Sequence, residues 1–266
     1  MTDKKPAWAI EKDRRRKQGP EPVWLFGIHA VRDALMNPAR QRLRLILTRN
    51  AAARLEEAVA ASGMTPEIAD PRKFPAPLDP GSVHQGAALQ TLPLDWGGVA
   101  DICGHGEPGL VVMLDRVTDP HNVGAILRSA EVFGARAVIA PLRHAAPETG
   151  ALAKSASGAL ERQPYLRVKN LAAAMEEVRA LGYRLIGLAG EAEAELSDAI
   201  ATSGDAIALV LGAEGPGLRD KTRETCDVIA SIPSAGAFGS LNVSNAAAVS
   251  LYAATMKDRI GSAQNN

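Results

Sequence analysis

The stretch that decides the fold is "GLVVMLD" at residues 109–115, together with "DPHNVGAILRSAEVFGA" at residues 119–135. The first is a short, continuous apolar run, and the second follows an Asp-Pro turn with apolar residues at helical spacing. A buried strand that leads directly into a helix is typical of a parallel sheet whose two faces are covered by helices. One residue departs from the pattern, because Arg128 lies inside this otherwise apolar helix.

Strand-like and helix-like segments keep alternating along the rest of the chain. Further strands are expected at 135–141, 164–168, 183–190, 206–212 and 227–233, with helices at 151–161, 170–182 and 240–259. Because these strands are largely apolar, the sequence predicts an α/β domain with a parallel sheet. In such a sheet, ligands bind outside the carboxyl ends of the strands.

The residues before this domain predict a second, smaller α/β unit. Short strands are expected at 23–26, 43–48 and 84–94, with helices at 28–35 and 51–63. The predicted organisation is a disordered basic tail at 1–22, a small domain at 23–94, a glycine-rich linker at 95–109 and the large domain at 110–260.

The composition is that of an ordinary globular protein, with 46% hydrophobic residues and a formal net charge of zero. The charge is unevenly spread, because residues 1–54 hold thirteen Lys and Arg against five Asp and Glu. Such a basic region can bind phosphates even on a neutral chain, since the attraction acts over about 8 Å at physiological salt. The run "EKDRRRKQ" within it is equally typical of a solvated, disordered tail.

Targeting and metal-binding signals are lacking in the sequence. No segment approaches the ~20 apolar residues of a membrane span, and the N-terminus has no apolar core like that of a signal peptide. We therefore expect a cytoplasmic protein with no membrane partner. Cys103 and Cys226 lie far apart and outside any metal-ligand spacing, so they are expected to be buried free thiols, and no metal site is predicted.

Three of the expected strand ends carry glycines and polar residues: "LDRVTDPHNVGAILRSA" at 114–130, "LVLGAEGPGL" at 209–218 and "SIPSAGAFGSLNVSNA" at 231–246. Each loop alone has a structural interpretation. The glycines suit tight turns, Ser240 or Asn242 suits a helix N-cap, and Arg128 suits an arginine that extends from a half-buried helix into solvent. Together, three such loops at strand ends indicate a shared cleft.

The cleft does not match the commonest nucleotide or hydrolase sites. The sequence lacks a GxGxxG fingerprint after the first strand of the large sheet, a P-loop and a GxSxG nucleophile elbow. Pyrophosphate ligands and hydrolysis are therefore disfavoured.

In their order and separation, the three loop sequences closely resemble the motifs of the SpoU/TrmH branch of the SPOUT RNA 2′-O-methyltransferases. In addition, "FGIHAVRDAL" at 26–35 and "HQGAAL" at 84–89 are similar to the L30e-like substrate-binding domain of the 23S rRNA guanosine 2′-O-methyltransferase subfamily. The resemblance covers about residues 24–258. It implies a trefoil-knotted C-terminal methyltransferase domain, an L30e-like N-terminal domain, a homodimer, and S-adenosylmethionine as the cofactor.

The resemblance also implies which residues form the site. The family's catalytic positions fall on Asn122, Arg128, Glu214, Ser240 and Asn242, and its cofactor pocket on Gly190, Gly212, Ile232 and Leu241 with Ser240. Methyl transfer to a ribose hydroxyl needs alignment and removal of a proton. As a hypothesis, Arg128 holds the phosphate beside the target ribose and stabilises the developing alkoxide, with Glu214 orienting it. Holding an arginine neutral as a base at pH 7 would instead cost roughly 7 kcal/mol.

RNA contacts are predicted in the basic segment "ARQRLRLILTRN" at 39–50. On a regular strand, Arg42 and Arg44 would lie on one face, and phosphate contacts are expected from Arg40, Arg42, Arg44 and Arg49. The resemblance favours 23S rRNA as the substrate. A tRNA substrate and a noncatalytic RNA-binding assembly protein remain as alternatives.

Overall fold

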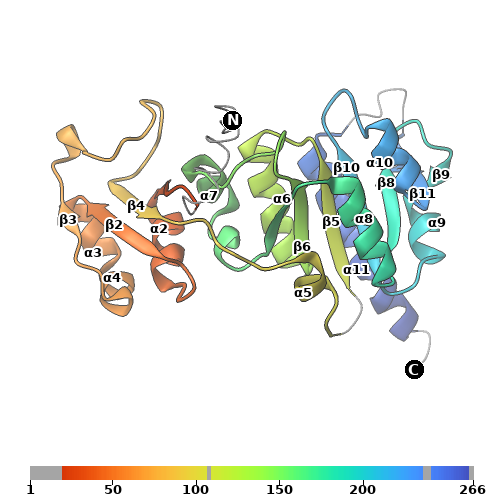
Figure 1. Cartoon of the computed structure of the whole chain (residues 1–266), viewed down its shortest axis with the longest axis horizontal. Coiled ribbons are helices and arrows are strands. Elements are labelled where there is room, and N and C mark those ends of the chain that lie inside the picture. Colours follow the sequence, from red (N-terminus) through yellow and green to blue (C-terminus); the bar gives the residue numbers. More distant parts are fainter. Residues whose placement is uncertain (1–19, 107–108, 236–240, 264–266) are drawn as a thin grey trace, which may run out of the picture.

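The computed structural model describes residues 20–106, 109–235 and 241–263, and it forms two α/β parts that lie side by side along one axis (Figure 1). Most of the predicted basic tail, residues 1–19, lies outside the described residues. Among the described residues, no helix has the length and apolar character needed to cross a membrane.

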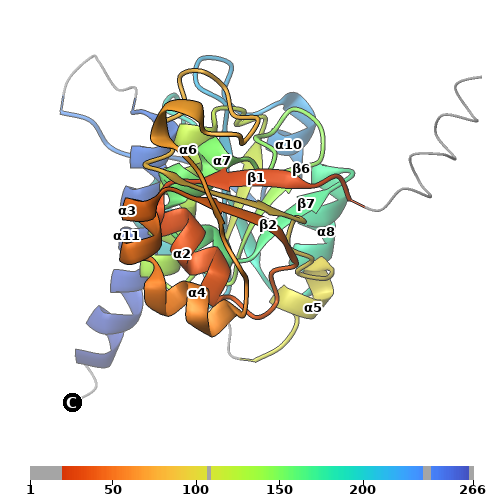
Figure 2. The ribbon, with the colours of Figure 1, turned by 90° about the vertical axis from the view of Figure 1, so that its left-hand side faces the viewer.

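The N-terminal domain, which faces the viewer in Figure 2, is built around a four-stranded sheet with strand order β1-β4-β2-β3. Strands β1 and β2 each pair antiparallel with β4, and β3 pairs parallel with β2. Its elements are β1 (Val23–Phe26), α2 (Ile28–Met36), β2 (Arg42–Leu47), α3 (Arg49–Arg54), α4 (Glu56–Ser62), β3 (Glu67–Ile68), the 3-10 turn η1 (Pro71–Lys73) and β4 (Ala87–Thr91). The helix predicted over 51–63 is therefore two short helices, and the second ends at Gly63 with a φ of 68°.

The C-terminal domain contains a seven-stranded sheet with strand order β7-β6-β5-β10-β8-β11-β9, in which every pairing is parallel. Its strands are β5 (Leu110–Asp115), β6 (Ala137–Pro141), β7 (Tyr165–Val168), β8 (Arg184–Leu188), β9 (Ala194–Glu195), β10 (Ile207–Gly212) and β11 (Val228–Ser231). Its helical elements are α5 (Val99–Cys103), α6 (Pro120–Val132), α7 (Gly150–Ala156), the 3-10 turn η2 (Ala159–Glu161), α8 (Leu171–Ala180), α9 (Leu196–Ala201), α10 (Asp220–Thr225) and α11 (Val243–Ala263). The parallel α/β class predicted from the apolar runs is confirmed.

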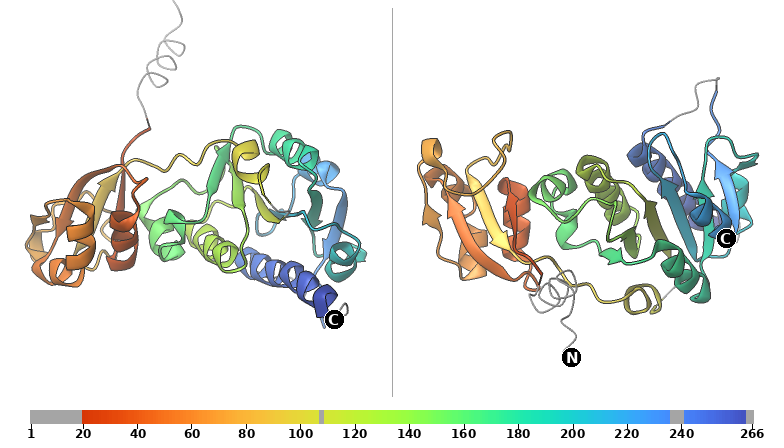
Figure 3. Two further views of the ribbon diagram at one scale, coloured as in Figure 1. Left: turned by 90° about the horizontal axis from the view of Figure 1, so that it is seen from below. Right: turned by 45° about the horizontal axis from the view of Figure 1, so that its top comes forward.

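Both faces of this sheet are buried. Along β5, Val112 and Leu114 belong to one hydrophobic cluster with α6, α9 and α11, whereas Val111 and Met113 belong to a second cluster with α5 and α8. The view from below shows α6 and α11 on one side of the sheet and α5 and α8 on the other (Figure 3). Because successive strand residues face opposite sides, a strand covered twice must be apolar throughout, which is the pattern in the sequence.

The segment predicted to be a linker is partly a structural element of the large domain. Val99 and Cys103 in α5 are buried in the second cluster, against α8. The segment 95–109, expected to be a glycine-rich linker, thus contributes to the core, because the five-residue α5 presents its two end residues to the sheet-covering helix. Burial also raises the pKa of the Cys103 thiol to about 11.

The two domains pack closely through β1 and α2 on one side and α7 and η2 on the other. A Cβ atom at Gly150 in α7 would lie 2.3 Å from Cδ1 of Phe26, so only glycine allows this approach. At Gly158, which has a φ of 90°, a Cβ atom would overlap the carboxylate of Asp33. Close packing of this kind fixes the orientation of the N-terminal domain.

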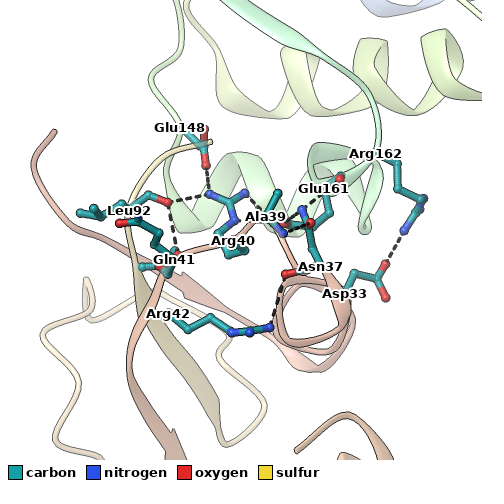
Figure 4. Close-up of polar contacts among 11 residues, drawn as sticks. Asp33, Asn37, Ala39, Arg40, Gln41, Arg42, Leu92, Glu148, Glu161 and Arg162 are labelled. Carbon is teal, nitrogen blue, oxygen red and sulfur yellow. Dashed lines mark hydrogen bonds and ion pairs between the residues drawn. The ribbon is translucent and has the colours of Figure 1, made fainter. Parts of the chain in front are cut away.

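A buried arginine joins the domains (Figure 4). Arg40 is only 2% exposed. Its Nε and Nη2 donate to the two carboxylate oxygens of Glu161 at 3.0 and 2.6 Å, and its Nη1 donates to the Leu92 carbonyl at 2.9 Å and to Glu148. Asn37 adds a 2.9 Å hydrogen bond to Glu161. We call Arg40, Asn37, Glu148 and Glu161 the interdomain cluster.

The interdomain cluster overturns one prediction. Arg40 was expected to contact RNA phosphates, and this is wrong because its guanidinium is enclosed by two carboxylates and a carbonyl from its own chain. Burial opposes the charge of Arg40, but the hydrogen bonds and charges of Glu161 and Glu148 outweigh it and leave the pKa of Arg40 above its ordinary value. For Glu148, burial is the larger effect and raises the pKa of the carboxyl despite Arg40.

Candidate cofactor and RNA-binding site

A cavity of about 670 Å³ opens at the carboxyl ends of β8, β10 and β11. It lies where ligands are expected in a parallel sheet, and its size is typical of a small-molecule pocket. All four predicted cofactor positions that fall in the described residues line it, namely Gly190, Gly212, Ile232 and Leu241. Loops that are distant in sequence therefore converge on one site.

Small residues shape the wall of this cavity. A Cβ atom on Gly212 would lie 2.1 Å from the carbonyl carbon of Gly217, so the loop can fold back on the end of β10 only if residue 212 is glycine. The turn is closed by a 2.9 Å hydrogen bond from the Gly217 amide to the Ala213 carbonyl. Gly215 and Gly217 adopt positive φ values of 82° and 68°, which disfavour other residues. These requirements explain the glycine spacing of "LGAEGPGL".

Beside the cavity, three polar side chains from three loops meet. Oε1 of Glu214 accepts hydrogen bonds from Nδ2 of Asn122 at 3.2 Å and from Nδ2 of Asn242, and it faces the Val243 amide at 3.4 Å. Nδ2 of Asn242 also donates to Oδ1 of Asn122 at 3.0 Å. The structure thus brings together Asn122, Glu214 and Asn242, which we call the polar triad.

Asn242 makes hydrogen bonds with both ends of its side-chain amide. Its Oδ1 accepts hydrogen bonds from the Ser244 amide at 2.9 Å and from the Ser244 hydroxyl at 2.5 Å, and its carbonyl accepts from the Ala246 amide, as expected of a helix N-cap. Its amide group donates to the other members of the polar triad. The sequence offers capping and a site role as alternatives for Asn242. The structure shows the cap together with the hydrogen bonds to Asn122 and Glu214, because an amide carries an acceptor and a donor at opposite ends.

Arg128 lies on α6, six residues after Asn122, with an exposed side chain. It makes no hydrogen bond or ion pair to any residue that the structure describes, and Glu214 is bonded to the two asparagines rather than to it. The described residues therefore leave the guanidinium available to a ligand. Ser240, predicted for both the catalytic and the cofactor set, lies outside the described residues.

Sequence reasoning missed two ion pairs next to the cavity. Glu191 and Arg223 both line it and pair with each other, and the hydrogen bond from Arg223 lowers the pKa of Glu191. At the end of β5, the fully buried Asp115 accepts hydrogen bonds from the Arg219 amide at 3.0 Å and from its guanidinium at 2.7 Å. A carboxylate at the end of an apolar strand was the available signal for the second pair. No sequence signal pointed to the first.

The predicted RNA-contacting arginines differ in their surroundings. A β-bulge lies between Arg42, opposite Thr91, and Arg44, opposite Gln90, so the two side chains lie on opposite faces of the sheet. The prediction of a shared face is wrong for this reason. Arg42 donates to the Leu35 carbonyl at the end of α2, and the exposed Arg44 pairs with Glu67. Arg49 is exposed.

Comparison with known proteins identifies the family. The sequence profile described as the SpoU rRNA Methylase family matches residues 109–252. The chain belongs to the SpoU rRNA methylase family. This SpoU-family chain is 38% identical over 253 residues to the 23S rRNA (guanosine-2′-O-)-methyltransferase RlmB of Vibrio vulnificus, covering 90% of this chain and 98% of the relative. It is also 38% identical to the protein of that name from Escherichia coli, over 86% of this chain and 96% of the relative.

A solved structure agrees with the family assignment. The SpoU methyltransferase AviRb from Streptomyces viridochromogenes, crystallised in complex with the cofactor AdoMet, superposes on this SpoU-family chain with a TM-score of 0.76 at 26% sequence identity. The match covers 90% of this chain and 91% of AviRb. An rRNA methyltransferase from Sinorhizobium meliloti shares the fold with a TM-score of 0.73 at 21% identity. The likeness extends over both domains.

Proposed function

We propose that this chain is an S-adenosylmethionine-dependent RNA 2′-O-ribose methyltransferase that acts on a guanosine of 23S rRNA. One observation carries the proposal: a cavity walled by glycine-rich loops lies against a polar triad drawn from three separate motifs. The names of the RlmB relatives support the substrate and the reaction, and the AdoMet complex of AviRb supports the cofactor.

The cavity fits S-adenosylmethionine chemically. Gly215 and Gly217 line the cavity, and nothing lies within 4 Å of where their Cβ atoms would be, so a planar base can approach the chain closely there. Ile232 and Leu241 supply apolar surface, while Glu191 and Arg223 supply charges of both signs for a ligand that carries both. We infer that Gly190, Gly212, Ile232 and Leu241, with Ser240, hold the cofactor. Bound there, S-adenosylmethionine supplies an electrophilic methyl group.

The chain's own residues must place the ribose hydroxyl and accommodate its lost proton. In this proposal the polar triad, with Ser240, orients the ribose: Asn122 and Asn242 are already fixed by Glu214, so little ordering is needed when RNA binds. Arg128, unpaired among the described residues, binds the adjacent phosphate and stabilises negative charge on the 2′ oxygen. It acts while remaining charged, because deprotonating an arginine at pH 7 costs roughly 7 kcal/mol.

We further propose a trefoil knot, an L30e-like N-terminal domain and a homodimer. The position of β10 between β5 and β8, with the loops after β8, β10 and β11 meeting at one cavity, supports the knot. The mixed four-stranded sheet supports the L30e-like domain. An apolar surface on the neighbouring helices α6 and α11, where Val132 is 76% exposed and Tyr252 is 54% exposed, supports a second copy as partner.

The test is transfer of tritium from labelled S-adenosylmethionine to total RNA from cells that lack the protein. The labelled RNA is separated by size and digested to nucleosides. Label in large-subunit rRNA as 2′-O-methylguanosine is the expected result. Label in tRNA would retain the reaction and replace the substrate. Tight cofactor binding with no transfer to any RNA or ribosomal precursor would refute the enzymatic proposal.

A further inference from the structure

We propose that the carboxyl ends of β5, β6 and β7, together with α7, form a basic track that binds the phosphates of the RNA between the N-terminal domain and the polar triad. This inference rests on the proposed function and adds to it the path of the substrate. The track consists of Arg116, Arg143, Lys154 and Lys169.

The track occupies one half of the sheet edge whose other half forms the cavity. In the strand order, β7, β6 and β5 come before β10, β8 and β11. Lys169 follows β7, Arg143 follows β6 and Arg116 follows β5, so each lies just beyond a carboxyl end. In Figure 1 these strands stand between the N-terminal domain and the cavity half of the sheet. An RNA that reaches the triad from the N-terminal domain has to cross this edge.

The four cations of the track are exposed. None of them makes a hydrogen bond or an ion pair with its side chain to any residue in the described ranges. The neighbouring carboxylates are engaged elsewhere: Glu148 pairs with Arg40, and Asp119 caps the first turn of α6 by accepting from the His121 amide. The cap leaves Asp119 charged, but the four cations outnumber it, so this edge carries an excess of positive charge that suits a polyanion.

The loop that carries Arg143 is held in a defined position. Arg167 on β7 donates to the carbonyls of Leu142 at 2.7 Å and Ala146 at 3.0 Å, and the Tyr165 hydroxyl donates to the same Ala146 carbonyl at 2.8 Å. Within this loop His144 has a φ of 60°, a left-handed conformation that is unfavourable for residues other than glycine. Fixed and strained loops of this kind are concentrated at functional sites.

Arg116 shows the same feature at the neighbouring strand end. Its φ is 62°, also left-handed, and the Ala146 amide donates to the Val117 carbonyl, which ties the two loops together. Two adjacent strand ends thus hold a non-glycine residue in a costly backbone conformation, and each loop displays an arginine that has no partner among the described residues.

One residue of the track, Lys154, lies close to both ends of the path. Lys154 lies at the domain boundary, where its Cγ is 3.9 Å from the position of a Cβ on Gly27. The next residue, Ser155, places its hydroxyl 2.9 Å from Nδ1 of His121. His121 in turn precedes Asn122 of the polar triad. The interdomain cluster keeps these parts in one arrangement.

The test compares two double variants with the same change in net charge. Arg143→Gln/Lys169→Gln removes two track cations, and Arg136→Gln/Arg184→Gln removes two arginines from the opposite, amino-terminal edge at β6 and β8. Binding of transcribed 23S rRNA is measured by filter retention at several salt concentrations, and S-adenosylmethionine binding by calorimetry. Circular dichroism checks that each variant is folded.

Counterion release sets the expected size of the effect. Each lost phosphate contact reduces the slope of log affinity against log salt by roughly 0.7 to 0.9, which at 0.1 M salt is about a five- to eightfold loss of affinity. The track variant should therefore bind rRNA about 25- to 60-fold more weakly. The opposite-edge variant should bind like the wild type, and cofactor affinity should be unchanged in both.

The outcomes separate this inference from the proposed function. If the wild type methylates rRNA but the track variant retains its affinity, or both variants lose affinity equally, the track is wrong and the enzyme assignment stands. If the wild type binds the cofactor but no RNA at any salt concentration, both are wrong. Loss of rRNA affinity in the track variant alone, together with a smaller slope of log affinity against log salt, supports the track.

Discussion

The substitution Arg40→Met tests the interdomain cluster most directly. Methionine occupies a similar volume and keeps apolar packing, but it removes every donor that Arg40 presents to Glu161, Glu148 and the Leu92 carbonyl. Two carboxylates then remain buried without their cation. Removing one partner of a buried ion pair costs about 3–5 kcal/mol in the free energy of unfolding. For a chain of this size, that loss lowers the melting temperature by roughly 6–20 °C.

The matched control is Arg44→Met on the same strand. Arg44 and Glu67 form an ion pair whose side chains are 45% and 48% exposed. Such surface pairs contribute less than about 1 kcal/mol, so this variant should unfold close to the wild type. Urea and thermal unfolding followed by circular dichroism give the free energy of unfolding and the melting temperature of both variants under the same conditions.

The loss in Arg40→Met should depend on pH in a definite direction. Burial already raises the pKa of Glu148 in the folded protein, and removing Arg40 raises it further. Below the pKa of Glu148 in the unfolded chain, the carboxyl is neutral in both states, and the variant loses the least free energy of unfolding. As pH rises through the pKa of Glu148 in the folded protein, ionisation of this carboxyl costs free energy only in the folded state. The loss in the free energy of unfolding therefore grows. A loss under ~1 kcal/mol, or one that is the same in acid and at neutral pH, would refute the reasoning.

Three further outcomes are expected. Arg128→Lys keeps the charge but loses the paired planar donors, so the rate of methyl transfer should fall about a hundredfold or more. Calorimetry should show unchanged cofactor affinity. Near-full activity would exclude the proposed role of Arg128 in binding the phosphate and stabilising charge on the 2′ oxygen. Gly212→Ala places a methyl group 2.1 Å from the Gly217 carbonyl carbon and should weaken cofactor binding at least about tenfold. The control Gly204→Ala, whose new methyl group would have nothing within 4 Å, should leave cofactor affinity unchanged. Equal cofactor affinities of the two variants would contradict the steric argument. Burial raises the pKa of Cys103 to about 11 and of Cys226 to about 12, so at about pH 8.5 iodoacetamide should alkylate the folded protein far more slowly than the urea-unfolded chain. The stability that these neutral thiols contribute is present below their unfolded pKa and is lost as pH rises through 11 to 12. Fast alkylation of the folded chain would contradict the raised pKa values of the buried Cys103 and the partly buried Cys226.

Much of the large domain could be predicted from its sequence because its physical signals are local. An apolar run such as Leu110–Asp115 identifies a strand buried on both faces, and the glycines of "LGAEGPGL" identify a turn that no larger residue allows. The convergence of Asn122, Glu214 and Asn242 follows from parallel topology, because all three follow carboxyl ends of strands in one sheet.

The N-terminal arginines show where sequence reasoning fails. Period-two spacing assumes a regular strand, and the bulge between Arg42 and Arg44 breaks that assumption without leaving a glycine or proline to mark it. The burial of Arg40 depends on Glu148 and Glu161, which are more than a hundred residues away in the sequence. A long-range partner of this kind has no local pattern, so the sequence alone predicts phosphate contacts from Arg40 as well as from the other arginines of the segment.

The interdomain cluster also limits how this chain can be divided or recombined. A fragment that begins after β4 would leave Glu148 and Glu161 facing water without their cation, and it would uncover the surface of α7 that packs against Phe26. An N-terminal domain transplanted from a relative would have to bring an arginine at the position of Arg40 and an asparagine at that of Asn37. The two domains have separate sheets. Even so, they should unfold together in one transition, and recombination between relatives should keep both domains from the same parent.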